Sequence, residues 1–583
     1  MRVIHLGTFC VFLVLWPAAF AKTNFTQCLQ MLNDGTFGDH PDGARNNKGM
    51  QVPAVDATAV SYDFCKTSCG AGPEPFSWTT FSTQFSSWLL PWLALLSQLP
   101  FGSTFPTDDV VSVFLTVGSP ALAAYSLILT ILNGKWVSRR LSGIRYPNVH
   151  YIWRVLNSLQ QSSLNIDDSE GMLASLVILP ENDEWWEEMA HGLDYTQTWS
   201  PSTISQIAWV FIAYLFTVIV SFLDTPDSVT ANSNGQGVGS GFLWLLPIVI
   251  GWLQLSPKCD SARVGEAFFR ADGKAFRATD DPTRPALASE STGHRALSLS
   301  SYKDSEARHD EEASAPIYNY ARVLPWIANV ERVFSVLHTA AERAACNEPV
   351  SPDARWKPAD RHKCVADDNR RGTLEQVLLY ACRPRAPQTG RIDPDFVSRF
   401  MIATAMAFFL QWATVGGAII AVWFTPAIGL GCRSGSYLLY AAVGTIVWAI
   451  MVTSSFFAYY STMESSDTLC ARHSRMASRR AAGIIAVLLR RFGKFLATLN
   501  SIWIVLCCIL QFSSSFDTCW CNASVLGLGK DAFYVISFLP SDIRAMTRAW
   551  ILGIVLALGS AVVFGIFVYL HINPPSPAPP KRV

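Results

Sequence analysis

Two long apolar runs, separated by only twelve residues, constrain the fold of this chain more than any other feature. The first run starts at Phe400 and reads FMIATAMAFFLQWATVGGAIIAVWF; the second ends at Tyr460 and reads YLLYAAVGTIVWAIMVTSSFFAYY. About 20 apolar residues at a rise of 1.5 Å cross the roughly 30 Å hydrocarbon core of a bilayer, so each run is long enough to span. The joint TPAIGLGCRSGS must then turn the chain around at one membrane face.

The composition also favours a membrane protein with several spans. Half of the 583 residues are hydrophobic, the mean hydropathy is +0.24, and only 15% of the residues are charged, below the usual quarter. The 45 basic and 45 acidic residues cancel, so the bulk charge indicates no nucleic-acid partner.

We predict an all-α membrane protein: a bundle of about seven transmembrane helices with a short Cys-containing exterior N-terminal segment and cytosolic loops whose apolar periodicity is helical. Besides the first two runs, the sequence offers spans at 110–132, 204–222, 241–255, 495–512 and 550–570. We expect Pro120 to kink the first of these without breaking it. The apolar stretch Trp88–Phe101 is short and interrupted by Pro91 and Pro100, so we expect residues 85–101 to be re-entrant or interfacial. If this stretch also spans, the count becomes eight.

The orientation follows from the N-terminus and from the placement of positive charge. Residues 1–21 have the apolar core and the Ala-x-Ala ending of a signal peptide, which predicts an exterior start for the mature chain. Lys and Arg near span ends stay in the cytosol, and they cluster after 132, between 472 and 494, and at the C-terminus. We therefore expect an exterior N-terminus, a cytosolic C-terminus and a membrane of the secretory pathway, most simply the plasma membrane.

This topology divides the chain into segments of alternating sidedness. They are a signal peptide (1–21), an exterior Cys-containing segment (22–84), a re-entrant or interfacial segment plus the first span (85–132), a cytosolic loop (133–203), two spans (204–257), a long, partly disordered cytosolic region (258–399), two spans with a short exterior loop (400–460), an Arg-rich cytosolic loop (461–494), two spans with an exterior Cys-containing loop (495–570) and a Pro-rich cytosolic tail (571–583).

Cysteine parity agrees with this topology. It places six cysteines outside, where disulfides persist: Cys28, Cys65, Cys69, Cys432, Cys519 and Cys521. The N-terminal segment holds three of them, an odd number, so one must pair elsewhere, with Cys432 or with the Cys519/Cys521 pair. Two sequons, at Asn24 and Asn522, are candidates for glycosylation.

The residues predict no catalytic site, cofactor or metal. The spans hold neutral polar groups in place of charges, and we expect these to bond between helices: Gln206, Gln411, Thr414, Asn500 and Gln511. The acidic, Trp-containing patch at 183–188 could serve acid–base or metal chemistry, but we favour a membrane-interface patch with its acids facing water. A zinc site from Cys346, His362, Cys364 and Cys382 lacks the usual paired spacing.

Several stretches resemble an uncharacterised family of fungal multi-pass integral membrane proteins. They are SWLLPWLALLSQLPFGS, LTVGSPALAAYSL, LVILPENDEWW, NGQGVGSGFLWLLPIVIGWLQLSPKCD, APIYNYARVLPW, NRRGTLEQV and FLQWATVGGAIIAVWFTPAIGLGCRSGSYLLY, spread over roughly residues 65–460. The resemblance implies a fungal source and a membrane location, and it implies no activity.

The sequence thus favours a non-enzymatic membrane protein of receptor-like or scaffolding type, with a small-molecule transporter or channel as the alternative. Its expected partners are the lipid bilayer and a cytosolic protein that binds residues 258–399. A polar cavity at the bilayer midplane would favour transport, whereas a solid bundle would count against both transport and ligand sensing.

Overall fold

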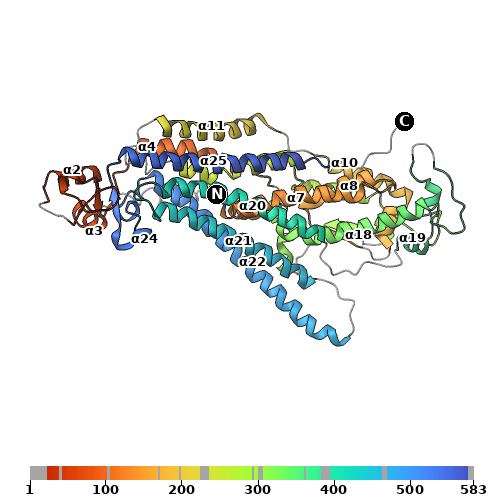
Figure 1. Ribbon diagram of the computed structural model, residues 1–583. Helices are drawn as coiled ribbons and strands as arrows, with labels where there is room; N and C mark the ends of the chain where they lie inside the picture. Colours follow the sequence, from red (N-terminus) through yellow and green to blue (C-terminus); the bar gives the residue numbers. More distant parts are fainter. Residues whose placement is uncertain are drawn as a thin grey trace, which may run out of the picture.

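The computed structural model describes residues 23–37, 42–101, 106–167, 171–195, 199–223, 235–291, 295–299, 306–359, 363–382, 394–462 and 469–575. The expected signal peptide and the end of the Pro-rich tail lie outside this part of the chain. The described residues form three regions along one long axis (Figure 1). We call them the cap (23–77, 513–539 and the joint 425–434), the bundle, and the polar domain (142–195 and 258–382).

The cap brings together two segments that are far apart in the sequence. Its elements are α2 (Phe25–Asn33), β1 (Ala44–Arg45), β2 (Ala59–Ser61), α3 (Tyr62–Phe64), α23 (Cys519–Asn522), α24 (Val525–Leu528) and β7 (Phe533–Val535). The strands form one antiparallel sheet in the order β1-β2-β7, with Val60 opposite Tyr534. Phe25, Leu32 and Val60 are fully buried in its small core. The cap therefore folds only when both ends of the chain contribute to it.

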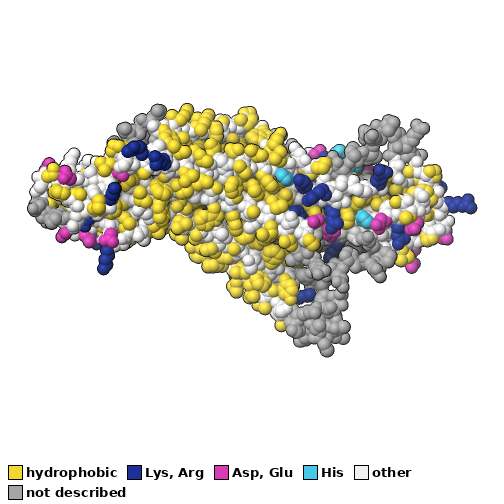
Figure 2. Space-filling view, in the orientation of Figure 1, with side chains coloured by type: hydrophobic (Ala, Val, Ile, Leu, Met, Phe, Trp, Pro, Cys, Tyr) yellow, Lys and Arg dark blue, Asp and Glu magenta, His cyan; other side chains and the backbone are white. Residues whose placement is uncertain are grey.

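The bundle consists of apolar helices. They are α4 (Trp78–Gln84), α5 (Leu90–Leu96), α6 (Pro106–Gly118), α7 (Pro120–Leu141), α11 (Pro201–Leu223), α13 (Gly235–Phe242), α14 (Leu245–Leu255), α20 (Pro394–Trp423), α21 (Cys432–Thr462), α22 (Leu469–Phe512) and α25 (Pro540–His571). The outward-facing side chains here are hydrophobic, and Figure 2 shows them as a continuous band between the charged ends of the molecule. An apolar exterior is the reverse of a water-soluble helix bundle and suits a lipid surrounding.

Five helices are long and apolar enough to cross a membrane: Pro201–Ile219, Pro394–Trp423, Cys432–Thr462, Ala477–Phe512 and Pro540–His571. A sixth is possible if the bent pair Thr107–Gly118 and Pro120–Leu141 is one span. The described residues thus give fewer spanning helices than the seven expected. The run 241–255 lies in a shorter apolar helix, Gly239–Leu255, and the run 110–132 is bent by 104° where a mild kink was expected.

Residues 85–101 lie inside the bundle. After α4 the helix continues as η4 (Phe85–Leu89) into α5. The Trp88 ring meets Tyr214 of α11 with centroids 5.8 Å apart, and the Trp92 ring meets Phe242 of α13 at 4.5 Å. Trp88 and Trp92 are 6% and 3% exposed, whereas Leu90 and Leu93 are 48% and 43% exposed, so the segment packs against the bundle by one face.

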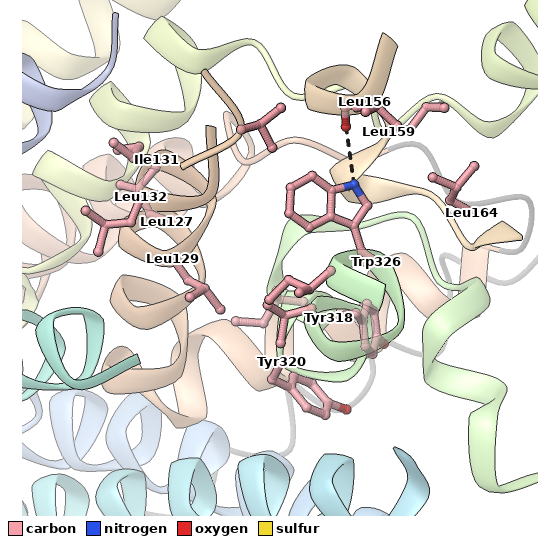
Figure 3. Close-up of a cluster of buried hydrophobic side chains, with 14 of the residues drawn as sticks. Leu127, Leu129, Ile131, Leu132, Leu156, Leu159, Leu164, Tyr318, Tyr320 and Trp326 are labelled. Atoms are coloured by element: carbon pink, nitrogen blue, oxygen red, sulfur yellow. Dashed lines mark hydrogen bonds between the residues drawn. The ribbon is translucent and has the colours of Figure 1, made fainter. Parts of the chain in front are cut away.

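The polar domain is mostly helical, as the periodicity of its sequence predicted. It contains α8 (Val149–Ser158), β3 (Leu164–Ile166), α9 (Met172–Ile178), α10 (Asp183–Gly192), α15 (Ser261–Asp272), β4 (Phe276–Arg277), β5 (Ala286–Leu287), α16 (Ala288–Ser291), β6 (Leu297–Leu299), α17 (His309–Glu312), α18 (Asn319–Ala345) and α19 (Leu374–Ala381). Its core continues into the bundle through α7, whose Leu127 and Leu129 are fully buried. Figure 3 shows Trp326 of α18 at the centre, its indole donating to the Leu156 carbonyl oxygen at 3.2 Å.

Part of the stretch expected to be disordered, 279–312, has a defined structure. Strand β5 pairs with β4, and β6 pairs with β3, each in an antiparallel two-stranded sheet. Residues 292–294 and 300–305 fall outside the described residues. The low hydrophobicity of this stretch misled the prediction because part of its order comes from the pairing of β6 with the distant strand β3.

Candidate functional site

A buried cluster of charges joins the bundle to the polar domain. At its centre is Asp310 of α17, with a side chain only 3% exposed. Lys494 of α22 places its Nζ 2.6 Å from Asp310 Oδ1, and Arg490 Nε lies 3.5 Å from the same oxygen. The Tyr320 hydroxyl donates to Asp310 Oδ2. We call Asp310, Tyr320, Arg490 and Lys494 the junction cluster.

The junction cluster is an ionised site. Burial alone would raise the pKa of Asp310, but Lys494, His309 and Arg490 outweigh burial and hold this pKa below its ordinary value of 3.8. A buried carboxylate between two bases is strongly coupled to them, because removal of one partner leaves an uncompensated charge in a low dielectric. The cluster therefore fixes the position of α22 relative to α17.

More contacts on both sides extend this attachment. Arg490 also donates to the Glu306 carbonyl oxygen, and Arg491 pairs with the Glu306 carboxylate. Within the facing segment, the Arg308 guanidinium donates two hydrogen bonds to the Glu311 carboxylate, from Nε at 2.9 Å and from a terminal nitrogen at 2.6 Å. Two turns of α22 are thus bound to the segment 306–312.

A break in a helix at the centre of the bundle is the second notable site. Helix α6 ends at Gly118 and α7 begins at Pro120, with Ser119 in an extended conformation between them. A Cβ on Gly118 would lie 2.1 Å from the Ala497 carbonyl oxygen, so only glycine allows α22 to approach this closely. Pro120 fits the first turn of α7 because that position needs no N–H donor.

Side chains from three neighbouring helices satisfy the backbone groups that the break frees. The Tyr440 hydroxyl donates to the Val117 carbonyl oxygen at 2.7 Å, and Asn500 Nδ2 donates to the Gly118 carbonyl oxygen at 2.8 Å. Gln411 Oε1 accepts from the Ala121 N–H at 2.9 Å. Non-helical backbone is tolerated away from water only where it is buried in protein and bonded in this way.

Gln411 and Asn500 bond between helices, as predicted for the neutral polar side chains, whereas Thr414 does not among the described residues. Gln411 also donates to the Ala441 carbonyl oxygen and the Thr445 hydroxyl, both at 2.9 Å. Thr414 bonds within its own helix, to the Leu410 carbonyl oxygen at 2.8 Å. Gln206, which is half-buried on α11, has no partner for its Oε1 in the described structure.

Two small cavities lie among the described residues. One cavity of about 20 Å³ lies between the segment 99–101, α6, α7, α14 and the segment 315–317, with Ser112 and Ser126 in its wall. A second, of about 30 Å³, lies at the turn 425–434 beside Arg433 and Asn522. Each is about large enough for a water molecule and neither admits a larger substrate.

The six candidate cysteines form three disulfides in the cap. Cys28 pairs with Cys69, Cys65 with Cys519, and Cys432 with Cys521. The sequence left open whether the third N-terminal thiol pairs with Cys432 or with the Cys519/Cys521 pair. In the structure this thiol is Cys65, and it pairs with Cys519. The neighbouring residues Cys519 and Cys521 thus tie the N-terminal segment and the start of α21 to the same short helix.

A buried ion pair supports this arrangement. Arg433, 7% exposed, places a terminal nitrogen 2.6 Å from Asp517 Oδ1 and the other 2.7 Å from Asn522 Oδ1. The single base in the joint between the two apolar runs is therefore neutralised inside the cap. Glu74 lies beside this pair, and burial, then repulsion from Asp517, raise its pKa to about 7 against the attraction of Arg433.

The two sequons differ in their surroundings. Asn24 is exposed and caps α2, accepting a hydrogen bond from the Gln27 N–H at 3.0 Å. Asn522 is 5% exposed and bonded to Arg433, so a glycan on its amide does not fit the folded cap. The prediction for Asn24 stands as a prediction.

The tryptophans of the acidic aromatic patch are buried in protein. Trp185 and Trp186 are 1% and 0% exposed in the core of the polar domain, and Trp186 donates to the Leu176 carbonyl oxygen at 3.0 Å. The acids pair with bases, with Asp183 accepting two bonds from Arg370 at 2.6 Å and 2.8 Å. The patch is a structural joint between α10 and the segment 367–371.

The described residues hold no group of three or more His, Cys, Asp or Glu arranged for a metal ion. Cys346, Cys364 and Cys382 are exposed, and His362 falls outside the described residues.

Sequence reasoning missed the junction cluster because Asp310 lies in the stretch that looked disordered and because α22 seemed to begin at 495. Helix α22 in fact starts at Leu469, so Arg490 and Lys494 lie within it. One signal was available. Four acids between 306 and 312 complement the bases at 490–494.

Comparison with known proteins adds no relative, since no protein family, no curated protein and no solved structure matches the chain. The resemblance to fungal membrane proteins remains a prediction.

Proposed function

We propose that the chain is a membrane scaffold that holds a cytosolic polar domain and an exterior cap in fixed register across a bilayer. The exterior side is assigned to the cap because its six cysteines are paired, which an oxidising compartment favours. The polar domain holds the exposed free thiols Cys346, Cys364 and Cys382, which suits the reducing cytosol. The membrane proposed is that of the secretory pathway, most simply the plasma membrane.

The path of the chain supports seven crossings even though fewer helices have full span length. Glu74 donates its backbone N–H to the Asp517 carbonyl oxygen at the cap, whereas the wall of the smaller cavity brings Pro100 and Phe101 beside Pro316 of the polar domain. Residues 75–141 therefore make one passage in short pieces. Residues 235–255 make another, and the five long helices complete the count.

The observation that carries the scaffold proposal is that the polar groups at the helix break in the centre of the bundle have partners within the protein. At the helix break, backbone groups form hydrogen bonds with the side chains of Gln411, Tyr440 and Asn500. The nearby cavity has room for about one water molecule. A carrier needs polar groups left free to meet a substrate. A scaffold instead needs a bundle that holds its helices in a single arrangement. The partner proposed is a cytosolic protein bound through residues 258–382.

Transport is the second candidate, and the helix break favours it. Broken helices near the bilayer midplane form the binding sites of many transporters. In that case the contacts at Ser119 would describe a closed state, and water would reach Gln411 and Thr414 in another.

Thiol accessibility separates the two. A variant whose free cysteines are replaced and whose disulfides are kept receives one new cysteine at a time, as Thr414→Cys, Val55→Cys or Phe269→Cys. Thr414 is fully buried, whereas Val55 in the cap and Phe269 in the polar domain are 77% and 82% exposed. Each variant is treated in intact cells with a membrane-impermeant maleimide, then after permeabilisation, then after denaturation.

The scaffold proposal expects Val55→Cys to react in intact cells, Phe269→Cys only after permeabilisation, and Thr414→Cys only after denaturation. Labelling of Thr414→Cys in native membranes would overturn it in favour of transport. Reversed labelling of the two exposed sites would overturn the orientation.

A further inference from the structure

Helix α22 is longer than a membrane is thick. Its described part, Ala477–Phe512, has 36 residues and is about 54 Å long, against a hydrocarbon core of roughly 30 Å, and its apolar run is 495–512. Figure 1 shows α21 and α22 leaving the long axis of the molecule together toward the polar end. A helix longer than the core is thick either tilts within the membrane or extends beyond the core, and the position of its lower half, 477–494, depends on the side chains that this half exposes.

One face of this lower half is exposed and mostly apolar among the described residues, with Arg491, which pairs with Glu306, at its edge. Ile484, Leu488, Phe492, Phe495 and Leu499 are 62%, 61%, 53%, 59% and 46% exposed, and their spacing of three and four residues places them on one stripe. We call these five residues the α22 stripe. It continues upward into Ile502, 47% exposed, and so into the hydrophobic band of the bundle (Figure 2).

The opposite face of the same turns is occupied. The Ala486 carbonyl oxygen accepts from Ser454 of α21 at 2.8 Å, and a Cβ on Gly493 would lie 2.4 Å from the Met451 sulfur. Arg490 and Lys494 face the junction cluster. The α22 stripe is therefore the surface that this segment presents to its surroundings.

Basic side chains mark the lower end of the stripe. Arg480 is exposed one turn before Ile484, and Arg479 beside it is half-buried. The sequence of α22 contains seven bases and no acidic residue. Long basic side chains at the end of an apolar stripe keep their charges at the headgroup level while their stems cover hydrocarbon. Near an anionic leaflet each such base contributes about 1 kcal/mol.

We propose that residues 477–499 lie tilted in the cytosolic leaflet and bind anionic phospholipid, with Arg479 and Arg480 on the headgroups and the α22 stripe among the acyl chains. This inference rests on the proposed membrane function. Continuity of the stripe with the membrane band and the excess of positive charge select an anionic leaflet as the occupant.

The experiment uses the full chain, reconstituted in phosphatidylcholine bilayers with increasing phosphatidylserine. An environment-sensitive fluorophore is attached to Leu488→Cys or, as a reference in mid-span, to Val555→Cys on α25, which is 61% exposed. Brominated acyl chains should quench both probes, and phosphatidylserine should shift the emission of the Leu488→Cys probe in a saturable way.

The charge requirement is tested with Arg479→Gln/Arg480→Gln. At about 1 kcal/mol per base, the phosphatidylserine midpoint should rise by roughly 10- to 30-fold. The matched control Arg544→Gln/Arg548→Gln removes two exposed bases from the cap end of α25 and should leave the midpoint unchanged.

The outcomes separate the two proposals. If bromine quenches the Val555→Cys probe but not the Leu488→Cys probe, the leaflet proposal fails and the membrane function stands. If neither probe is quenched, the membrane function itself fails. Equal midpoints for the Arg479/Arg480 variant and its control would overturn the anionic site. Energy transfer between Leu488→Cys probes that depends on protein density would assign the stripe to a second copy of the chain.

Discussion

The two ends of the bundle are fastened to their neighbouring regions by different chemistry. The cap has a small core and three disulfides, two of which, Cys65–Cys519 and Cys432–Cys521, join segments that are distant in the sequence. The polar end has no disulfide among its described cysteines, and it relies on a continuous hydrophobic core and on the junction cluster.

The difference follows from size and surroundings. The cap segments are too short to bury enough apolar area to offset the entropy of ordering them, so covalent links supply what the core lacks. The polar domain buries whole helices such as α9, and it needs only a device that sets its angle to the bundle. A buried ion pair serves this purpose because it tolerates few geometries.

The variant Asp310→Asn gives the strongest test of the contrast between the two ends of the bundle. The change leaves Arg490 and Lys494 facing a neutral amide at a buried position, and it should cost about 3–5 kcal/mol in the attachment of α22 to the polar domain. Amide hydrogen exchange should rise in residues 306–320 and 484–495 while the cap amides keep their protection.

The control is Glu306→Gln, which removes the partner of Arg491 in the same segment. Both side chains of this pair are more than half exposed, so the loss should be below about 1 kcal/mol. If the two variants exchange equally fast, the junction cluster has no special role.

The covalent end is tested by the double change Cys65→Ser/Cys519→Ser, which removes one link without leaving a free thiol. Loss of a disulfide from a small domain costs about 2–4 kcal/mol. Limited proteolysis should then release the segment 23–77, and the amides of β2 and β7 should exchange faster. Intact protection of the cap would show that its core and the Arg433–Asp517 pair suffice, and the contrast between the two ends would disappear.

The sequence predicted the disulfide-linked cap better than the junction cluster at the polar end, and the reason is physical. Thiols in an oxidising compartment have essentially one role, so counting them by compartment selects all six paired cysteines, although it leaves their pairing open. Carboxylates and bases have many roles, and Asp310 looked like any acid in a polar stretch. Its partners Arg490 and Lys494 were assigned to a loop because the apolar run was read as starting at 495.

The helix break illustrates the same limit. Pro120 was visible and predicted a bend, but the angle of 104° depends on the close approach of Gly118 to Ala497 and on bonds from Gln411, Tyr440 and Asn500. These contacts come from three other helices, which local sequence does not encode. Gln206 and Gln411 look alike as single polar residues in apolar runs, yet only Gln411 has both its amide oxygen and its nitrogen bonded.

Gln411→Leu therefore should cost more than Gln206→Leu. The first change removes the acceptor of the Ala121 N–H and two donated bonds from the core, worth about 1–2 kcal/mol. The second removes a half-buried amide whose oxygen has no partner, and it should change stability by less than about 0.5 kcal/mol. Thermal unfolding of the two variants in the same detergent measures the difference, and equal shifts would contradict the assigned role of Gln411.

The smallest expected effect is a pH dependence confined to the cap, and it comes from Glu74. Its pKa is about 7 in the folded chain and 4.5 in the unfolded chain, so between these values only the folded chain holds this proton. Stability from this group is thus complete below pH 4.5, falls as the pH rises toward 7, and is constant above. Burial also raises the pKa of Asp517, although the charge of Arg433 opposes this shift. Both carboxyls therefore make the cap more stable at acidic pH. Because Glu74 is partly exposed, solvent screening reduces the effect to about 1 kcal/mol.

Hydrogen exchange of the β2 and β7 amides, corrected for intrinsic rates, should show more protection at pH 5 than at pH 8, and Glu74→Gln should reduce this difference while the polar end stays unchanged. A difference of the same size in Glu74→Gln would assign the pH response to Asp517 alone.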